Sequence, residues 1–387
     1  MSVVARPVVG IVAGEASGDF LGAGLIEALH ARLPGARFVG IGGPRMQAAG
    51  MEVLFPMEKL AVRGYVEVLR HYLEILGIRR QLAGRFLRTP PACFVGIDAP
   101  DFNLDLELQL KRAGIPTVHY VSPAIWAWRA KRIHKIKRAV SAMLVVFPFE
   151  EPIYRQAQIP VTYVGHALAD ELAHHPGRAA ARLQLRVGPD ASVVALLPGS
   201  RVSEVGQMAA PFLAAARLIA EGRPDTHFLL PVVSRETRDR AEAALRELPG
   251  EPLNVTILSG HAHNAMAAAD LVLVASGTAT LEAALLGRPM VIAYRMPRVS
   301  WWIMKRLGRV AHVGLPNILA GERLVPELLQ DEATPANLAS AALELMGDPV
   351  ACARLQTRFA ALLEQLKQGA ASKAAEALLP FVASARA

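Results

Sequence analysis

The sequence predicts an α/β protein with two doubly wound domains, each built on a parallel β-sheet. The 387 residues are too many for one ordinary hydrophobic core. Short apolar runs flanked by Gly or Pro alternate with helical patterns along most of the chain. Strands buried on both faces give such continuous runs, and helices between them indicate parallel pairing. Hydrophobic residues make up 52% of the chain, enough to fill two cores and too many for a disordered protein.

The first half of the chain opens with the apolar run 7–14 and a helical pattern over 20–33, in which Leu21, Leu25 and Leu29 share one face. Later apolar runs predict further buried strands. These runs are RFVGIGG (37–43), ACFVGIDAP (92–100), PTVHYVSP (116–123) and SAMLVVFPF (141–149).

The second half repeats the architecture without repeating the sequence. Its predicted strands are SVVALLPGS (192–200), THFLLPVV (226–233), NVTILSG (254–260), DLVLVAS (270–276) and PMVIAYR (289–295), with helical patterns near 208–220, 238–248 and 280–287. The polar, Pro- and Gly-containing stretch 165–192 separates the halves. We therefore expect domains over 1–170 and 171–345, followed by helices over 346–387 that pack on the first domain or on a partner protomer.

Composition limits the function classes. A net charge of +8 favours an anionic partner, which leaves nucleic acid, an anionic membrane surface or a phosphorylated substrate. The most apolar stretch, 265–287, contains Asp270 and Glu282 and does not predict a membrane span. Cys93 and Cys352 are too few for a disulfide framework or a cysteine metal site. No secretion signal is recognisable, and the cytoplasm is the expected compartment.

Two turns that follow buried strands are candidate anion sites. Ligands of open α/β sheets bind at the carboxyl ends of the strands. After the first strand of the second half come Gly199, Ser200 and Arg201, which offer close backbone approach, free N–H groups at a helix start and a guanidinium. An ordinary strand-to-helix turn with a surface arginine would look the same.

The second turn contains Ser276, Gly277 and Thr278, with Glu282 in the helix that follows. Its N–H groups suit a diphosphate and Glu282 suits a pair of ribose hydroxyls, although the Ser and Thr could simply cap the helix. Two such turns in one domain favour a nucleotide diphosphate over a dinucleotide.

Acidic residues mark the first domain. Glu15 and Asp19 lie in the loop after its first strand and would repel phosphate, so a hydroxyl-bearing acceptor is more plausible there. Asp98 and Asp101 follow a later strand, where a carboxylate could act as a general base towards a hydroxyl. An Asx turn before Pro100 is the plainer explanation.

Three stretches combine apolar or aromatic residues with basic ones. The stretch 120–138 carries Trp126, Trp128 and Arg129 and could hold an anionic head group or be a solvated helix face; without an RNA-binding signature we expect no nucleic acid. The stretches 66–88 and 297–310, the second with Trp301 and Trp302, could lie on an anionic bilayer or be amphipathic helices facing a core. The scattered histidines do not predict a metal site.

Seven motifs occur in this order along the chain: VAGEASGD, FVGIDAPDFN, HYVSPAIWAWR, LLPGSR, SGTATLEAAL, MVIAYR and LPNILAG. In their order and spacing the sequence resembles the lipid-A-disaccharide synthases. The resemblance implies a GT-B glycosyltransferase that joins UDP-2,3-diacylglucosamine to 2,3-diacylglucosamine 1-phosphate (lipid X), with inversion, to give lipid A disaccharide 1-phosphate and UDP. It also implies no metal or cofactor, a peripheral position on the cytoplasmic face of the inner membrane, and homodimers in some members.

The resemblance assigns roles to residues of this chain. Ser200 and Arg201 match the turn that holds the UDP phosphates, and the 276–282 turn matches the second nucleotide loop, with Glu282 on the ribose. Asn317 falls on the nucleotide side. Asp98 matches the general base, while Glu15 and Asp19 lie in the acceptor-side loop; from the sequence, Asp101 or Glu15 could also be the base.

Two alternative functions stay open at this point. Another GT-B enzyme that uses UDP-N-acetylglucosamine, such as an epimerase or a peptidoglycan-type transferase, would share the nucleotide half but not VSPAIWAWR. A non-enzymatic protein that binds anionic membranes or nucleic acid would need the basic stretches but not Asp98.

Overall fold

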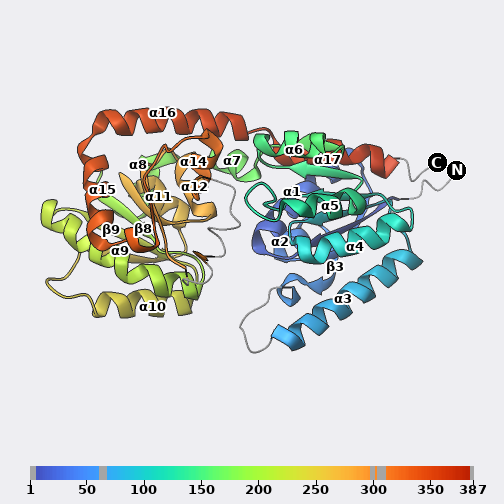
Figure 1. Ribbon diagram of the computed structural model, residues 1–387, viewed down its shortest axis with the longest axis horizontal. Helices are drawn as coiled ribbons and strands as arrows, with labels where there is room; N and C mark the ends of the chain where they lie inside the picture. Colours follow the sequence, from blue (N-terminus) through green and yellow to red (C-terminus); the bar gives the residue numbers. More distant parts are fainter. Residues whose placement is uncertain (1–5, 61–67, 297–300, 303–310, 384–387) are drawn as a thin grey trace. The chain divides into compact units, whose positions relative to one another are not determined.

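The chain folds into two α/β units, as the alternation of strands and helices predicts (Figure 1). The computed structural model describes residues 6–60, 68–296, 301–302 and 311–383. The first unit comprises Met1–Ala167 and Leu366–Ala387, and the second comprises Leu168–Gln365. The chain thus passes from the first unit to the second and returns for its last helix.

The described part of the first unit contains a seven-stranded parallel sheet in the order β3-β2-β1-β4-β5-β6-β7. Successive strands run outward from β1 to β3, and the next strand, β4, pairs with β1 on its other side. Strand order therefore reverses between β1 and β4. The strands are β1 (Val8–Ala13), β2 (Arg37–Gly42), β3 (Met51–Pro56), β4 (Cys93–Ile97), β5 (Thr117–Tyr120), β6 (Ala142–Val145) and β7 (Val161–Tyr163).

Helices cover both faces of this sheet. One buried cluster combines β-strand residues such as Val12 and Phe94 with α3 and α4, and a second combines α4, α5 and α6 with β6. On the other side α1 packs against α2 and α17. The helices are α1 (Ala16–Arg32), α2 (Pro44–Ala48), α3 (Val68–Arg88), α4 (Pro100–Arg112), α5 (Ile133–Ala139), α6 (Glu151–Gln156) and α17 (Ala370–Ala383).

The described part of the second unit contains a six-stranded parallel sheet in the order β10-β9-β8-β11-β12-β13. Its strand order reverses between β8 and β11. Val194 and Leu196 of β8 belong to one buried cluster, while Val193, Ala195 and Leu197 belong to the other, so the strand is apolar on both faces. The strands are β8 (Val193–Leu197), β9 (His227–Val232), β10 (Val255–Ser259), β11 (Leu271–Ala275), β12 (Met290–Tyr294) and β13 (Glu327–Leu329).

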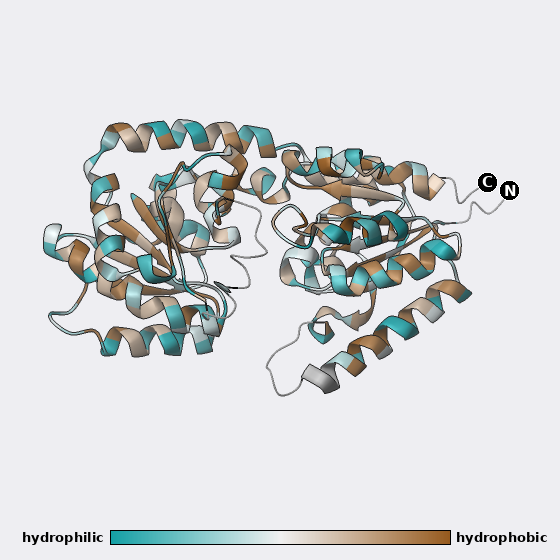
Figure 2. Ribbon diagram, in the orientation of Figure 1, coloured by the Kyte–Doolittle hydropathy of each residue, from teal (hydrophilic) through white to brown (hydrophobic). Residues whose placement is uncertain are grey.

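Different helices pack in the two buried clusters of the second unit. Residues of α9, α10 and α15 form one, and residues of α8, α11, α12 and α16 form the other. Figure 2 shows the brown, apolar strands of this unit between helices that carry teal, polar residues. The helices are α7 (Ala167–Leu172), α8 (Gly177–Gln184), α9 (Val202–Gly222), α10 (Arg235–Arg246), α11 (Ala262–Ala268), α12 (Thr278–Leu285), α14 (Leu315–Ala320), α15 (Pro335–Gly347) and α16 (Pro349–Leu366).

The C-terminal helices divide between the units, which differs from the single segment over 346–387 expected from the sequence. Leu355, Phe359 and Leu362 of α16 are buried in the core of the second unit. The end of α16 at Leu366 and the whole of α17 belong to the first unit, where α17 packs against α1. The amphipathic pattern of α16 fits any apolar surface, so the sequence could not show which unit it would cover.

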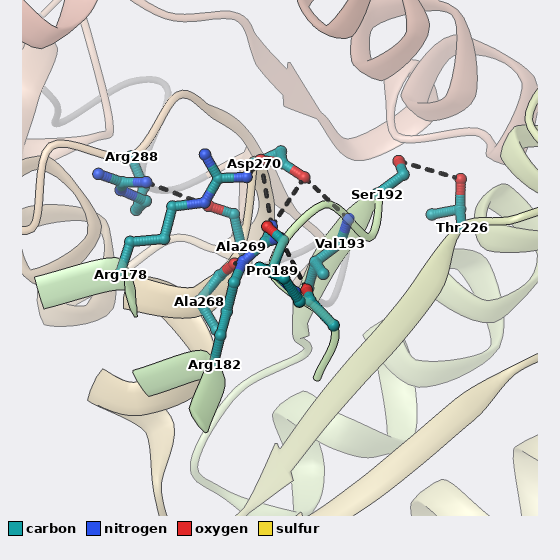
Figure 3. Close-up of polar contacts among 11 residues, drawn as sticks. Arg178, Arg182, Pro189, Ser192, Val193, Thr226, Ala268, Ala269, Asp270 and Arg288 are labelled. Atoms are coloured by element: carbon teal, nitrogen blue, oxygen red, sulfur yellow. Dashed lines mark hydrogen bonds and ion pairs between the residues drawn. The ribbon is translucent and has the colours of Figure 1, made fainter. Parts of the chain in front are cut away.

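An arginine cluster ties the amino ends of β8 and β11 to α8 (Figure 3). Asp270, just before β11, accepts a hydrogen bond from the Val193 N–H at 2.9 Å. Its carboxylate pairs with Arg178 and, at 3.2 Å, with the buried Arg182. Arg182 also donates to the carbonyl oxygens of Ala268, Gly188 and Pro189. The cluster lies at the strand ends opposite to those where ligands of such sheets bind.

Replacing Asp270 with Asn should destabilise the second unit by about 3 kcal/mol, because it leaves the buried Arg182 guanidinium without its counter-charge. Chemical denaturation measures the change, with the exposed Asp225→Asn as the matched control. Equal stability of the two variants would contradict this role for the cluster.

Candidate functional site

A pocket of about 360 Å³ lies at the carboxyl ends of the strands of the second sheet. It includes the turns after β8 and β11, the two strands between which strand order reverses. Ligands of open α/β sheets bind at this position, because the loops of the two strands diverge there and leave a crevice. The lining residues include Gly199, Ser200, Arg201, Glu204, Ser276, Gly277, Thr278, Glu282 and Tyr294.

The turn after β8 approaches the start of α9 closely. Gly199 has φ +130°, and a Cβ at this position would lie 2.4 Å from Cβ of Glu204. A residue with a side chain could occupy this position only if the turn moved. Glycine is therefore required both for the backbone conformation and for the contact with α9.

Glu204, three residues into α9, binds the N–H groups that the sequence analysis expected to be free for an anion. The N–H groups of Ser200 and Arg201 donate to its Oε2 at 3.0 and 3.1 Å, and Nη1 of Arg201 donates to its Oε1 at 3.0 Å. This is one half of a capping box: Glu204 stands three residues after the N-cap residue Arg201 and accepts its N–H, while the Arg201 side chain has no acceptor atom to complete the motif. The turn does bind an anionic group, but in this structure the group is the protein's own carboxylate.

The turn after β11 is open. Gly277 has φ +149°, and a Cβ built there would have no atom within 4 Å. The Oγ1 of Thr280 donates to the Gly277 carbonyl oxygen at 2.8 Å and fixes the turn. In α12, which begins at Thr278, the N–H of Thr280 donates to the Gly277 carbonyl oxygen at 3.1 Å, whereas the N–H groups of Thr278 and Ala279 precede the first intrahelical acceptor. This end of the pocket therefore offers hydrogen-bond donors and the positive end of a helix dipole.

Glu282 is held by a histidine that the sequence analysis did not connect with it. Its Oε2 lies 3.2 Å from Nε2 of His263 on α11, and this hydrogen bond raises the pKa of His263 above its ordinary value. The two residues are 19 positions apart, so only the packing of α11 against α12 brings them together. His263 restricts the rotamers available to Glu282 at the edge of the pocket.

Tyr294, at the end of β12, is another lining residue that the sequence analysis did not single out. Its phenol has a raised pKa, caused mainly by burial and also by the charge of Glu204. The strand-end rule applied to MVIAYR was a signal that could have found it.

The structure gives Asn317 a different position from the one expected. Asn317 is fully buried on α14 and does not line the pocket. Its amide donates to the Val325 carbonyl oxygen and to Glu327, and its Oδ1 accepts from Leu324 and Val325. All of its hydrogen bonds are thus used within the protein. Its proposed contact with the nucleotide has no support in this geometry.

In the first unit, Glu15 and Asp98 follow the two strands between which that sheet reverses its order. Glu15 follows β1 and is exposed, and Asp98 follows β4 and is half-buried. A Cβ on Gly14 would touch Cβ of Ala99 at 3.0 Å, so the two loops are in contact. The carboxylates predicted from the sequence therefore belong to adjacent loops at the carboxyl edge of this sheet.

The two aspartates after β4 differ in their surroundings. Asp101 is exposed and forms an ion pair with Arg132. The Asp98 carboxylate makes no such pair with a described residue, and its backbone has φ +49°, followed by φ +43° at Ala99. Non-glycine residues rarely adopt this conformation, and strained backbone concentrates at functional sites. Asp98 is the better candidate for a group that accepts a proton.

Asp19 is buried and binds the protein's own backbone. It is 2% exposed, and its carboxylate accepts hydrogen bonds from the N–H groups of Gly43, Arg45 and Met46 at 2.8 to 3.0 Å. It caps α2 and joins α1 to the loop after β2. Direct contact with an acceptor, as expected from the sequence, would require it to give up these bonds.

The aromatic stretch after β5 is only partly at the surface. Nε1 of Trp126 donates to the buried carboxylate of Glu150 at 3.2 Å, and the Trp126 ring packs on Phe149. Trp128 and Arg129 are exposed and stack on each other, with the guanidinium carbon 4.2 Å from the ring centre. Trp126 thus shapes the loop, and Trp128 and Arg129 present an apolar and a positive surface.

The stretches predicted to contact a membrane are only partly described. Tyr72, Leu73 and Leu87 of α3 are exposed apolar or aromatic side chains, and Figure 2 shows brown and teal residues alternating along this helix. Trp302 is exposed and Trp301 is half-buried, but the other residues of 297–310 lie outside the described part. Among the described helices, none is long and apolar enough to cross a bilayer.

Comparison with known proteins identifies the family. A sequence profile described as lipid-A-disaccharide synthetase matches residues 9–381. The chain belongs to the lipid-A-disaccharide synthase family. It is 56% identical to the lipid-A-disaccharide synthase of Methylobacillus flagellatus over 97% of this chain and 100% of that protein. It is 53% identical to that of Azoarcus sp. strain BH72 over 98% and 97%.

Several solved structures have a fold similar to that of this chain. The UDP-GlcNAc 2-epimerase of Neisseria meningitidis, solved with UDP-GlcNAc, superposes with a TM-score of 0.66 at 12% identity, covering 96% of this chain and 99% of the epimerase. MurG of Acinetobacter baumannii gives a TM-score of 0.61 at 14% identity, covering 97% and 99%. At such identities the likeness shows only the fold, which is GT-B.

Membership of the lipid-A-disaccharide synthase family makes the chain a glycosyltransferase, as the motifs predicted. The donor-side residues predicted from those motifs all line the pocket except Asn317. Sequence reasoning missed Glu204, His263 and Tyr294. Within the described residues, no cluster of three or more His, Cys, Asp or Glu side chains is arranged to hold a metal ion.

The Glu150 carboxyl should make the stability of the protein pH-dependent. Burial raises its pKa from 4.5 to about 7. The folded state therefore keeps a proton that the unfolded chain loses above pH 4.5. The stabilisation is complete below that pH and is lost as the pH rises through about 7, amounting to about 3 kcal/mol.

Denaturation of the wild type and Glu150→Gln across pH 4.5 to 8 measures this difference. The wild type should lose stability relative to the variant as the pH rises. Parallel curves for the two proteins would contradict the buried, protonated state of Glu150.

Proposed function

We propose that this chain transfers 2,3-diacylglucosamine from UDP to the 6-hydroxyl of 2,3-diacylglucosamine 1-phosphate, forming lipid A disaccharide 1-phosphate. The observation that carries the proposal is the pocket at the β8–β11 reversal, with two glycine turns, helix N-termini and Arg201 in one wall. Its volume lies within the range of about 300–1,000 Å³ typical of small-molecule sites. Membership of the lipid-A-disaccharide synthase family supplies the sugar chemistry.

The donor's diphosphate would bind between the two turns. The open turn at Gly277 offers the N–H groups at the start of α12, and Arg201 offers a guanidinium that is mostly exposed. Glu282, held by His263, would accept hydrogen bonds from the ribose hydroxyls. These donors would also stabilise the negative charge that develops on UDP as it leaves.

An anion that binds at the turn after β8 would have to compete with the Glu204 carboxylate. The carboxylate and a phosphate would compete for the N–H groups of Ser200 and Arg201, which are the donors that Glu204 now binds. A bound diphosphate either displaces this carboxylate or relies on α12 and the Arg201 guanidinium. In both cases Glu204 keeps Arg201 and the turn in place while no anion is bound.

Asp98 would act as the general base. The acceptor 6-oxygen attacks the anomeric carbon from the face opposite UDP, the bond from that carbon to the phosphate oxygen breaks, and the hydroxyl proton passes to Asp98. A single displacement of this kind inverts the anomeric configuration. Asp101 is a poorer candidate because Arg132 pairs with it at the surface.

The acylated substrates favour a position on the cytoplasmic face of the inner membrane. The exposed apolar side chains of α3 are accompanied by exposed arginines on the same helix. Arg80, Arg85 and Arg88 line a hollow of about 530 Å³ together with Leu54 and Phe55 of β3. A surface with apolar and positive groups suits the interface of an anionic bilayer.

Two variants test the assignment with UDP-diacylglucosamine and the monosaccharide 1-phosphate as substrates. Asp98→Asn should lower kcat by at least about 100-fold, the lower end of the range for general-base catalysis, and leave UDP affinity unchanged. Arg201→Ala should weaken UDP binding and lower kcat/KM by about 10-fold or more, because a charge-assisted contact is lost. Steady-state kinetics and UDP titration measure these effects.

Asp101→Asn is the matched control, since it removes a nearby carboxylate that is already paired with Arg132, and it should keep its turnover. Full activity of Asp98→Asn, or an equal loss in Asp101→Asn, would contradict the role given to Asp98. Unchanged UDP binding by Arg201→Ala would contradict the donor site.

A further inference from the structure

A buried polar cluster lies beneath the end of β4 in the first unit. Asn103 and Glu107 of α4 and His119 of β5 are all fully buried. Nδ1 of His119 lies 2.7 Å from Oε1 of Glu107, which ties α4 to β5. Asn103 and Glu107 are four residues apart on α4 and so share one face of the helix. Three buried hydrogen-bonding side chains therefore lie beside the strand that leads to Asp98.

The backbone of Asp98 is held at both of its polar atoms. Its N–H donates to the Tyr120 carbonyl oxygen at 2.9 Å. Its carbonyl oxygen accepts from Nδ2 of Asn103 at 2.8 Å. Asp98 and Ala99 are consecutive non-glycine residues with positive φ, a conformation that is unfavourable without such restraints. The Asn103 amide is the side chain that holds this turn.

The geometry of Asn103 suits this task. Its Nδ2 also lies 3.3 Å from the Ile97 carbonyl oxygen, so one amide group binds the last residue of β4 and the first residue of the turn. Its Oδ1 has no hydrogen-bond partner among the described residues, so the nitrogen makes the contacts of this side chain.

Gly96 makes room for the cluster. A Cβ at this position of β4 would lie 2.2 Å from Oε1 of Glu107 and 2.9 Å from Cβ of Asn103. The absence of a side chain in the strand and the polar side chains of the helix thus fit together. Together they set the distance between α4 and the end of β4, and Asp98 is the residue that follows this strand.

We propose that Asn103 is a positioning residue for Asp98: its amide nitrogen holds the left-handed turn that places the Asp98 carboxylate for proton transfer. The inference rests on the proposed role of Asp98 as the base. Asn103 acts through the Asp98 backbone and has no contact with substrate. Its loss should therefore affect turnover and leave substrate binding intact.

Asn103→Ala should lower kcat at least tenfold, with both KM values within threefold of the wild type. Thr117→Val is the matched control. Thr117 is also fully buried in this unit, and its Oγ1 donates to the Ala139 carbonyl oxygen at 2.7 Å. This variant loses a buried hydrogen bond of the same sheet, and it should keep kcat within twofold. An equal fall of kcat in the two variants would show a general effect of lost stability and overturn the inference.

Two further variants make the test independent of the folding of Asn103→Ala. Asn103→Ser can donate a hydrogen bond, and Asn103→Asp has the shape of Asn without the amide donor. Ser should recover part of the kcat lost in Ala, and Asp should not. In an Asp98→Asn background, Asn103→Ala should lower kcat by less than twofold, because residues that act as a unit are not additive.

Different results would refute the role of Asp98 as the base and the role of Asn103 in positioning it. Full activity of Asp98→Asn would refute the role of Asp98 as the base. An inactive Asp98→Asn, together with wild-type kcat in both Asn103→Ala and Asn103→Asp, would overturn the positioning role of Asn103 alone.

Discussion

Each sheet reverses its strand order once, and the positions of the candidate functional groups follow from these two reversals. In the second sheet the reversal separates the loops after β8 and β11, and the pocket lies between them. In the first sheet the loops after β1 and β4, which carry Glu15 and Asp98, lie at the corresponding position and are in contact at their bases. A parallel sheet buried on both faces leaves little else for a ligand to reach, since its helices cover everything but the strand ends.

At two helix starts, one in each unit, a carboxylate of the chain itself binds the backbone N–H groups. Glu204 binds the N–H groups at the start of α9, and Asp19 binds those at the start of α2. The difference lies in exposure, because Asp19 is buried with three donors and the N–H groups held by Glu204 border an open pocket. A carboxylate on the N–H groups of a helix start stabilises the unliganded protein, and at the edge of a pocket an incoming anion can replace it.

Much of the fold could be predicted from the sequence, and the strands that were not predicted have physical features that explain why. The central strands were predicted because burial on both faces makes them continuous apolar runs. The edge strands β7 and β13 were missed because they have only three residues each, and β3 because Glu52 interrupts its apolar run; the fourth edge strand, β10, has no charged residue and was predicted. The pocket residues after β8 and β11 follow from the strand-end rule. The links from Glu282 to His263 and from Asp98 to Asn103 depend on helix packing and on a left-handed turn, which the sequence does not show.

The central claim is that a uridine diphosphate binds at the two glycine turns of the second unit. A crystal structure of the protein with UDP tests it most directly. The account predicts diphosphate oxygens within hydrogen-bonding distance of the first N–H groups of α12 and of the Arg201 guanidinium, with the ribose beside Glu282. UDP bound away from the β8 and β11 turns, with Arg201 still paired only to Glu204, would contradict it.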